Sequence, residues 1–164
     1  MAFKDYLAHC FSKNNPLSEF IHNDFGFYPR NIALYELAFT HKSASENSLG
    51  NFKLNNERLE YLGDAVLSAA VADYLFRLFP TKAEGFLTEM RSKIVSRSSL
   101  NKLSQKLGFE RMIHYSHDAH SNFKSMTGNA FEALSVLYIS TEATTSPNTS
   151  SSTVSSGCIS IWIS

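Results

Sequence analysis

The sequence predicts an all-α domain, and three observations support this prediction. Apolar residues recur at helical spacing in several segments. Proline and glycine interrupt those segments where helices should end. A long, nearly all-apolar stretch also follows a cluster of acids, which indicates a central helix. With 164 residues and 43% hydrophobic content, the chain has the size and composition of one multi-helix bundle with a single core.

The first predicted elements precede the acidic cluster. Residues 1–24 are typical of an amphipathic leader helix, broken near Pro16. After Pro29, helical spacing predicts a helix over Ile32–Phe39. A polar stretch rich in Ser and Asn follows and should form a loop. His41, near the end of that helix, is better explained as a structural hydrogen-bonding group than as a metal ligand.

The next predicted helix begins in the stretch Asn55–Leu67, NNERLEYLGDAVL, and runs on to Pro80. Asn55 or Asn56 suits its N-cap. At about 100° per residue, its three acids fall within an arc of about 60°. Those acids are Glu57, Glu60 and Asp64. We expect the apolar side chains Leu59, Leu62 and Val66 on the opposite face.

Two interpretations of these acids are open. Acids on one helix face are commonly a solvated surface. However, no lysine lies between Asn55 and Arg77 to neutralise them, and like charges at this spacing repel. Gly63 costs a helix about 1 kcal/mol relative to Ala, which indicates a close backbone contact. On a buried helix, carboxylates are costly unless they are paired or bind metal, so divalent cations are the second interpretation.

Three further helices are predicted beyond Pro80. They are Phe86–Ser98, Asn101–Leu107 with Gly108 at its C-terminus, and a helix that begins in Gly128–Tyr138. The first presents Arg91, Lys93 and Arg97 among serines. These basic residues, with Lys42, are candidates for contacts with phosphate groups, although a solvated basic face explains them equally well.

A histidine-rich stretch between these helices raises the question of a zinc site. His114, His117 and His120 lie around Asp118, but no cysteine is nearby. We therefore expect a polar surface loop. The two cysteines, Cys10 and Cys158, lie far apart without metal-ligand spacing, as is usual in a reducing cytoplasm. We find no signal peptide and no segment long enough to span a membrane.

The stretch NNERLEYLGDAVL resembles the signature of the ribonuclease III family of double-stranded-RNA endonucleases, NERLEFLGDAVL. The motifs HKS, EGFLTEMRSKIVSRSSL and GNAFEAL follow the family's order and spacing, so the resemblance covers residues 25–134. GFYPRN at Gly26–Asn31 is similar to enzymes of the Bacteroides group. The resemblance implies the all-α ribonuclease III endonuclease domain.

The resemblance also implies a chemistry. Glu60, Asp64 and Glu132 would be catalytic and would hold Mg²⁺, or alternatively Mn²⁺, with Asn129 as a further ligand. The commonest family pattern has Asp in place of Asn129, so one negative charge is missing. Glu57, Glu84 and Asn56 would support the RNA or dimer cleft, and His41 would buttress the acidic helix.

The implied partners are double-stranded RNA and a second copy of the chain, with no membrane and no small-molecule cofactor beyond the metal. The family's products carry 5′-phosphate and 3′-hydroxyl ends, and its substrates include rRNA and mRNA precursors. An alternative is a catalytically inert RNA-binding scaffold of the same fold, as in ribosome-associated relatives. The net charge of +0 fits a binder of nucleic acid only if its basic surface is local or if a basic portion is missing.

The last thirty residues, 135–164, depart from the family pattern. They are rich in Ser and Thr and lack Lys and Arg, which is typical of a disordered tail. One lost base after the Leu134 codon would convert the family's GAIYLDRGY into the sequence that follows. We therefore expect a frameshifted chain without the family's double-stranded-RNA-binding domain. Sequencing the gene tests this expectation, because a shifted reading frame after the Leu134 codon must then encode GAIYLDRGY.

Overall fold

The all-α prediction is confirmed by the computed structural model, which describes residues 15–45, 53–116, 118 and 123–145. Its helices are α2 (Pro16–Phe25), α3 (Ile32–Ala38), α4 (Glu57–Leu78), α5 (Glu84–Ile94), α6 (Arg97–Lys106) and α7 (Phe123–Thr145). Two short 3₁₀ helices, η1 (Lys42–Ala44) and η2 (Phe109–Arg111), join them. An isolated β-bridge pairs Thr40 with His114.

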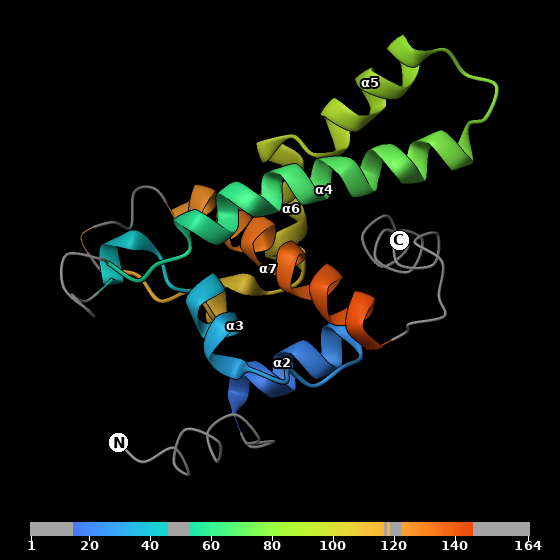
Figure 1. Ribbon diagram of the computed structural model, residues 1–164. Coiled ribbons are helices and arrows are strands. Elements are labelled where there is room, and N and C mark those ends of the chain that lie inside the picture. Colours follow the sequence, from blue (N-terminus) through green and yellow to red (C-terminus); the bar gives the residue numbers. More distant parts are fainter. Residues whose placement is uncertain (1–14, 46–52, 117, 119–122, 146–164) are drawn as a thin grey trace.

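Helix α7 is the centre of the bundle. It packs against α4, α6 and α3, and Figure 1 shows it crossing beneath α4. Nearly every described residue from Met126 to Tyr138 is buried, as expected of a helix that is covered on several sides. The prediction that the acidic helix is the central one is therefore corrected, because α4 fully buries only a narrow stripe of its residues.

The buried face of α4 also differs from the predicted one. Its fully buried residues are Gly63, Leu67, Val71 and Leu75. Leu62, expected in the apolar face, is 48% exposed, and Leu59 and Val66 are only partly buried. The face of α4 that contains Gly63 packs on α7. As a result, the acids lie at the edge of the contact between α4 and α7 and do not point away from α7.

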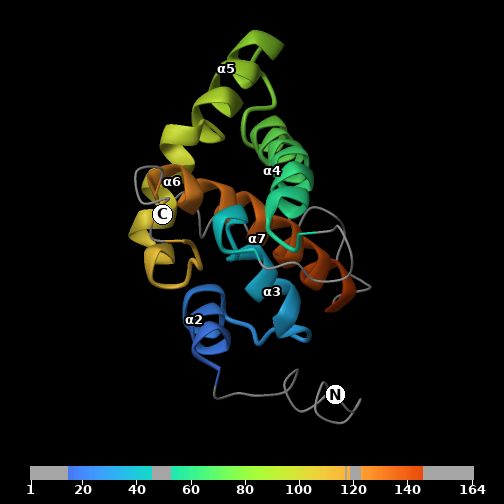
Figure 2. The ribbon, with the colours of Figure 1, turned by 90° about the vertical axis from the view of Figure 1, so that its left-hand side faces the viewer.

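Helix α5 and the far end of α4 form an arm that extends away from the other helices (Figures 1 and 2). No residue of α5 is fully buried. The helix predicted over 86–98 is in fact two helices, because the chain leaves helical geometry at Ser96. The Ser96 hydroxyl accepts a hydrogen bond of 3.3 Å from the Ser99 N–H and caps α6.

Both predicted domain boundaries fall inside helices. Helix α2 starts at Pro16, where the Asn15 side chain accepts a hydrogen bond of 2.9 Å from the Leu17 N–H, and it continues past residue 24. Its residues Leu17, Ile21 and Phe25 belong to the core, while residues 1–14 lie outside the described residues.

At the other end, α7 continues through residue 134 to Thr145. The expected disorder from residue 135 onward is corrected for this segment, because Val136, Leu137 and Tyr138 maintain the apolar pattern and are buried. The frameshift prediction itself is not tested, and residues 146–164 lie outside the described ones. Of the helices described, none combines the length and the apolar character needed to cross a membrane.

Candidate functional site

The three predicted catalytic acids lie around one open pocket of about 420 Å³. Glu60 and Asp64 come from successive turns of α4, and Glu132 comes from α7. The other lining residues are Glu57, Tyr61, Val95 and Arg97. We call this cavity the acidic pocket. The structure thus brings together carboxylates that are about seventy positions apart in the sequence.

Gly63 allows the two helices to meet at this point. A Cβ atom added there would overlap the carbonyl group of Glu132 and would lie 3.2 Å from the backbone nitrogen of Ala133. The obstacles are backbone atoms of a buried helix, so they cannot be displaced by a side-chain rotation. This confirms the close backbone contact that a glycine inside the acidic helix predicts.

The electrostatics of the acidic pocket are dominated by Glu132, which is only 6% exposed. Burial, and then the negative charges of Asp64 and Glu60, raise the pKa of Glu132 to about 7, while Arg97 opposes the shift. Burial likewise raises the pKa of Glu60. The carboxylates therefore repel one another, and a bound cation would relieve that repulsion.

The donor set fits a hard divalent cation in its chemistry. Carboxylate and amide oxygens are the ligands that Mg²⁺ prefers, and such ions keep several waters, so few protein ligands are needed. Among the described residues, however, no three acidic, His or Cys side chains are gathered closely enough to form a finished metal site. Glu60, Asp64 and Glu132 share the pocket without converging on one point.

Asn129 lies beside this set on α7 and is held by Arg97. The Arg97 Nη1 atom donates a hydrogen bond of 3.1 Å to the Asn129 Oδ1 atom. Its Nη2 atom lies 3.9 Å from the Glu60 Oε1 atom. Of the four predicted phosphate-binding residues, Arg97 is the one that lines the acidic pocket.

Glu57 and Lys42 form an ion pair at the edge of the site, with 3.1 Å between Nζ and Oε1. Asn56, predicted at the cleft, is instead 2% exposed and donates from its Nδ2 atom to the Ala38 carbonyl oxygen at 3.2 Å. Its place in the core joins the start of α4 to the end of α3. Asn55 accepts a hydrogen bond of 3.0 Å from the Glu57 N–H and acts as the capping residue.

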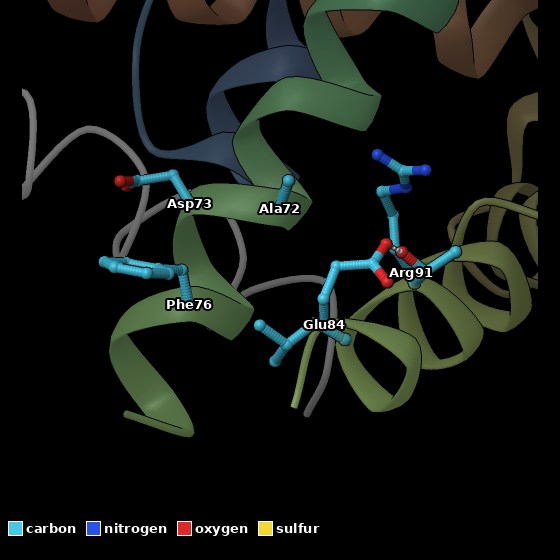
Figure 3. A pocket seen from close by; sticks show the side chains of 7 residues that line it. Ala72, Asp73, Phe76, Glu84 and Arg91 are labelled. Carbon is cyan, nitrogen blue, oxygen red and sulfur yellow. Dashed lines mark hydrogen bonds between the residues drawn. The ribbon is translucent and has the colours of Figure 1, made fainter. Parts of the chain in front are cut away.

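Glu84 and Arg91 line a different pocket, of about 340 Å³, between α4 and α5. Figure 3 shows both side chains projecting from α5 into this space, with Asp73 and Phe76 on the α4 side. The Thr88 hydroxyl donates a hydrogen bond of 2.7 Å to the Glu84 carboxylate. Within one chain, the structure therefore does not bring Glu84 to the acidic pocket.

Lys93, the remaining basic candidate, pairs with Glu89 on the exposed side of α5, with 2.6 Å between Nζ and Oε1. His41 has the structural environment expected of it. Its Nδ1 atom lies 2.8 Å from the Ser43 hydroxyl oxygen, its backbone N–H donates to the His114 carbonyl oxygen at 2.9 Å, and burial lowers its pKa. His117 and His120 of the histidine-rich stretch lie outside the described residues.

Sequence reasoning missed Tyr61. This residue lines the acidic pocket and is 83% exposed, an unusual position for a large aromatic side chain. The signal was present, because Tyr61 directly follows Glu60 and must flank the acidic face at helical spacing. Arg58, the cation within the acidic stretch, is exposed and is not among the residues lining the pocket.

Comparison with known proteins agrees with this geometry. A family model described as ribonuclease-III-like matches residues 31–144. Ribonuclease 3 of Bacteroides fragilis is 52% identical over 115 residues, which are 70% of this chain and 40% of that protein. Ribonuclease 3 of Phocaeicola vulgatus is 47% identical over 131 residues, which are 80% of this chain and 42% of that protein. The chain thus spans about 40% of the length of these relatives.

Among solved structures, the nuclease domain of ribonuclease III from Campylobacter jejuni superposes with a TM-score of 0.71 at 30% identity, covering 88% of this chain and 94% of that domain. A region of that domain takes part in dimer formation. The residues matched by the family model include α4, α6 and α7, which form the acidic pocket. The chain therefore belongs to the ribonuclease III family.

Proposed function

We propose that this chain is a Mg²⁺-dependent endonuclease that hydrolyses the phosphodiester bonds of double-stranded RNA and leaves 5′-phosphate and 3′-hydroxyl ends. One observation carries the proposal: acids from two separate helices, Glu60, Asp64 and Glu132, face one pocket without enough positive charge to balance them. Such an arrangement is costly in a protein without a cationic ligand.

In this proposal Glu60, Asp64 and Glu132 would hold the metal, Mg²⁺ or alternatively Mn²⁺, and the carbonyl oxygen of Asn129 would assist. A bound divalent cation supplies a water nucleophile at neutral pH and stabilises charge on the phosphoryl oxygens. The protein's own part is to keep Glu132 and Asp64 close together despite their repulsion, which the Gly63 contact accomplishes. Glu132 must lose its proton before it can bind the cation.

Duplex RNA would approach along the side of the molecule that presents Arg97, with Lys42 nearby through its ion pair to Glu57. Contacts with phosphates and 2′-hydroxyls recognise the A-form shape and not the base sequence. Arg91 and Lys93 on α5 would extend the phosphate contacts. Ribosomal and messenger RNA precursors, processed in the cytoplasm, contain long duplexes of the required kind.

We further propose that the chain acts as a homodimer. Helix α4 exposes large apolar side chains that a monomer has no reason to leave in water. They are Tyr61 at 83%, Phe76 at 68%, Leu78 at 50% and Leu62 at 48% exposure. In a dimer that covers these side chains, residues of one copy that lie far from its own acidic pocket, such as Glu84, could approach the pocket of the other.

The experiment is cleavage of a long, end-labelled RNA duplex at several concentrations of Mg²⁺ and with a chelator. We expect metal-dependent cutting of duplex but not of single-stranded RNA. Glu132→Gln should abolish cutting, whereas the matched change Glu110→Gln, at an exposed position of η2, should leave it intact. Duplex binding without metal-dependent cutting would contradict the proposal and favour the inert scaffold.

A further inference from the structure

Arg97 is the only cation that lines the acidic pocket among the described residues. It is the first residue of α6, directly after the Ser96 cap, so its backbone is fixed at the helix start. From there the guanidinium group reaches across to both of the other helices of the site. It contacts Asn129 on α7 at 3.1 Å and lies 3.9 Å from Glu60 on α4.

Both contacts are made with oxygen atoms that the proposed metal site needs. These atoms are the Asn129 Oδ1 and the Glu60 Oε1. The hydrogen bond occupies a lone pair of the Asn129 Oδ1 atom that a metal cation would need, whereas at 3.9 Å the guanidinium group meets Glu60 through its charge alone. The two positive charges would also repel each other within a few ångströms.

We propose that Arg97 is a built-in counter-ion of the metal-free site, which a divalent cation must displace in order to bind. The inference rests on the proposed metal-dependent function. Arg97 is thus a positioning residue: it links Glu60 on α4 to Asn129 on α7 before the metal arrives and is released toward the RNA phosphates afterwards.

The contacts of Arg97 are weak enough for a metal ion to break them. The Arg97 side chain is 69% exposed, and an ion pair 3.9 Å long at such a position contributes little to stability. Glu60, its partner, is 19% exposed in its side chain and has a pKa raised by burial, a shift that the Arg97 charge reduces. Arg97 can therefore leave for solvent, whereas Glu60 stays in the pocket.

The same geometry also permits the opposite role for Arg97. By donating to the Asn129 Oδ1 atom, the guanidinium could orient that amide and so help the metal to bind. The two roles predict opposite changes in metal affinity when the arginine is removed. Affinity for the metal, measured without RNA, therefore separates them.

The experiment is isothermal titration of the metal-free chain with Mg²⁺ at pH 8.5, where Glu132 is ionised. Arg97→Gln should lower the Kd for Mg²⁺ by about three- to tenfold, because one repelling charge near the site is removed. Arg97→Lys, which retains the charge, should remain within about twofold of the parent. Arg111→Gln removes the same charge from an exposed position of η2, outside the pocket, and should leave the Kd for Mg²⁺ unchanged.

A second readout is the thermal midpoint of each variant with and without Mg²⁺. The metal-induced rise should be larger for Arg97→Gln than for the parent, because its metal-free acids lack their counter-ion. An unchanged or higher Kd in Arg97→Gln overturns the inference while leaving the metal site in place. Absence of Mg²⁺ binding by the parent itself overturns the metal-dependent function, and the inference with it.

Discussion

Replacing Gly63 by Ala tests whether the contact between α4 and α7 sets the geometry of the acidic pocket. The added methyl would fall well within 3.0 Å of the Glu132 carbonyl group, closer than side chains pack. Ordinary carbon contacts are about 3.5 Å, so α4 would have to retreat by at least about 1 Å. That movement carries Glu60 and Asp64 away from Glu132.

The expected losses in stability and in activity differ in size. Overpacking costs about 1 to 3 kcal/mol, but Ala favours a helix over Gly by about 1 kcal/mol, so the free energy of unfolding should fall by about 0 to 2 kcal/mol. Misplacing catalytic groups by about 1 Å costs on the order of a hundredfold in rate. Cleavage should therefore suffer far more than folding.

Urea denaturation and duplex cleavage at saturating Mg²⁺ measure the two effects. Gly128→Ala is the matched control, because its added methyl would meet the end of the Asn101 side chain, which can rotate away. We expect that variant to unfold and to cleave much like the parent. If Gly63→Ala cleaves within about threefold of the parent while remaining folded, the contact does not position the acids and the reasoning is refuted.

Three further predictions concern charge and assembly. The pKa of Glu132 is raised in the folded state, so the stability it contributes is full below about pH 4.5 and is lost as the pH rises through about 7. Glu132→Gln should consequently stabilise the metal-free chain at pH 8 by about 1 to 2 kcal/mol, a value reduced for solvent screening, as thermal melts across pH would show. Asn129→Asp adds a charged oxygen and should tighten Mg²⁺ binding by about tenfold in calorimetry; an unchanged Kd would place this side chain outside the site. Tyr61→Glu should convert the proposed dimer to a monomer in sedimentation experiments, and an unaltered mass would exclude this part of α4 from the interface.

Local spacing and one long motif were enough to predict three features from the sequence. These are the all-α fold class, the long acidic helix and the three acids of the pocket. The packed face of α4 could not. Leu62 has the periodicity of a core residue, yet a backbone contact at Gly63 decides which side meets α7. Helical periodicity identifies an apolar face but does not detect a contact made by a residue without a side chain.

The position of Arg97 was missed for a related reason. Its spacing from Arg91 and Lys93 predicts one continuous basic helix, but the chain leaves the helix at Ser96 and begins a new one. The Ser96 hydroxyl cap, which an analysis of apolar periodicity does not detect, places Arg97 in a different helix from Arg91 and Lys93. Arg97 consequently lies beside the acids. The burial of Asn56 could not be predicted from the sequence either, because its hydrogen-bond partner, the Ala38 carbonyl group, is distant in sequence.

Helix α5, in the arm that it forms with the far end of α4, should be the most mobile of the helices that surround the site. Since α5 buries no residue completely, its amide protons should exchange with solvent much faster than those of α7. Because the chain leaves helical geometry at Ser96, between α5 and α6, we expect α5 to open without displacing Arg97 or the acids. A partner that docks on the arm would slow the exchange there, which makes α5 the natural reporter of assembly.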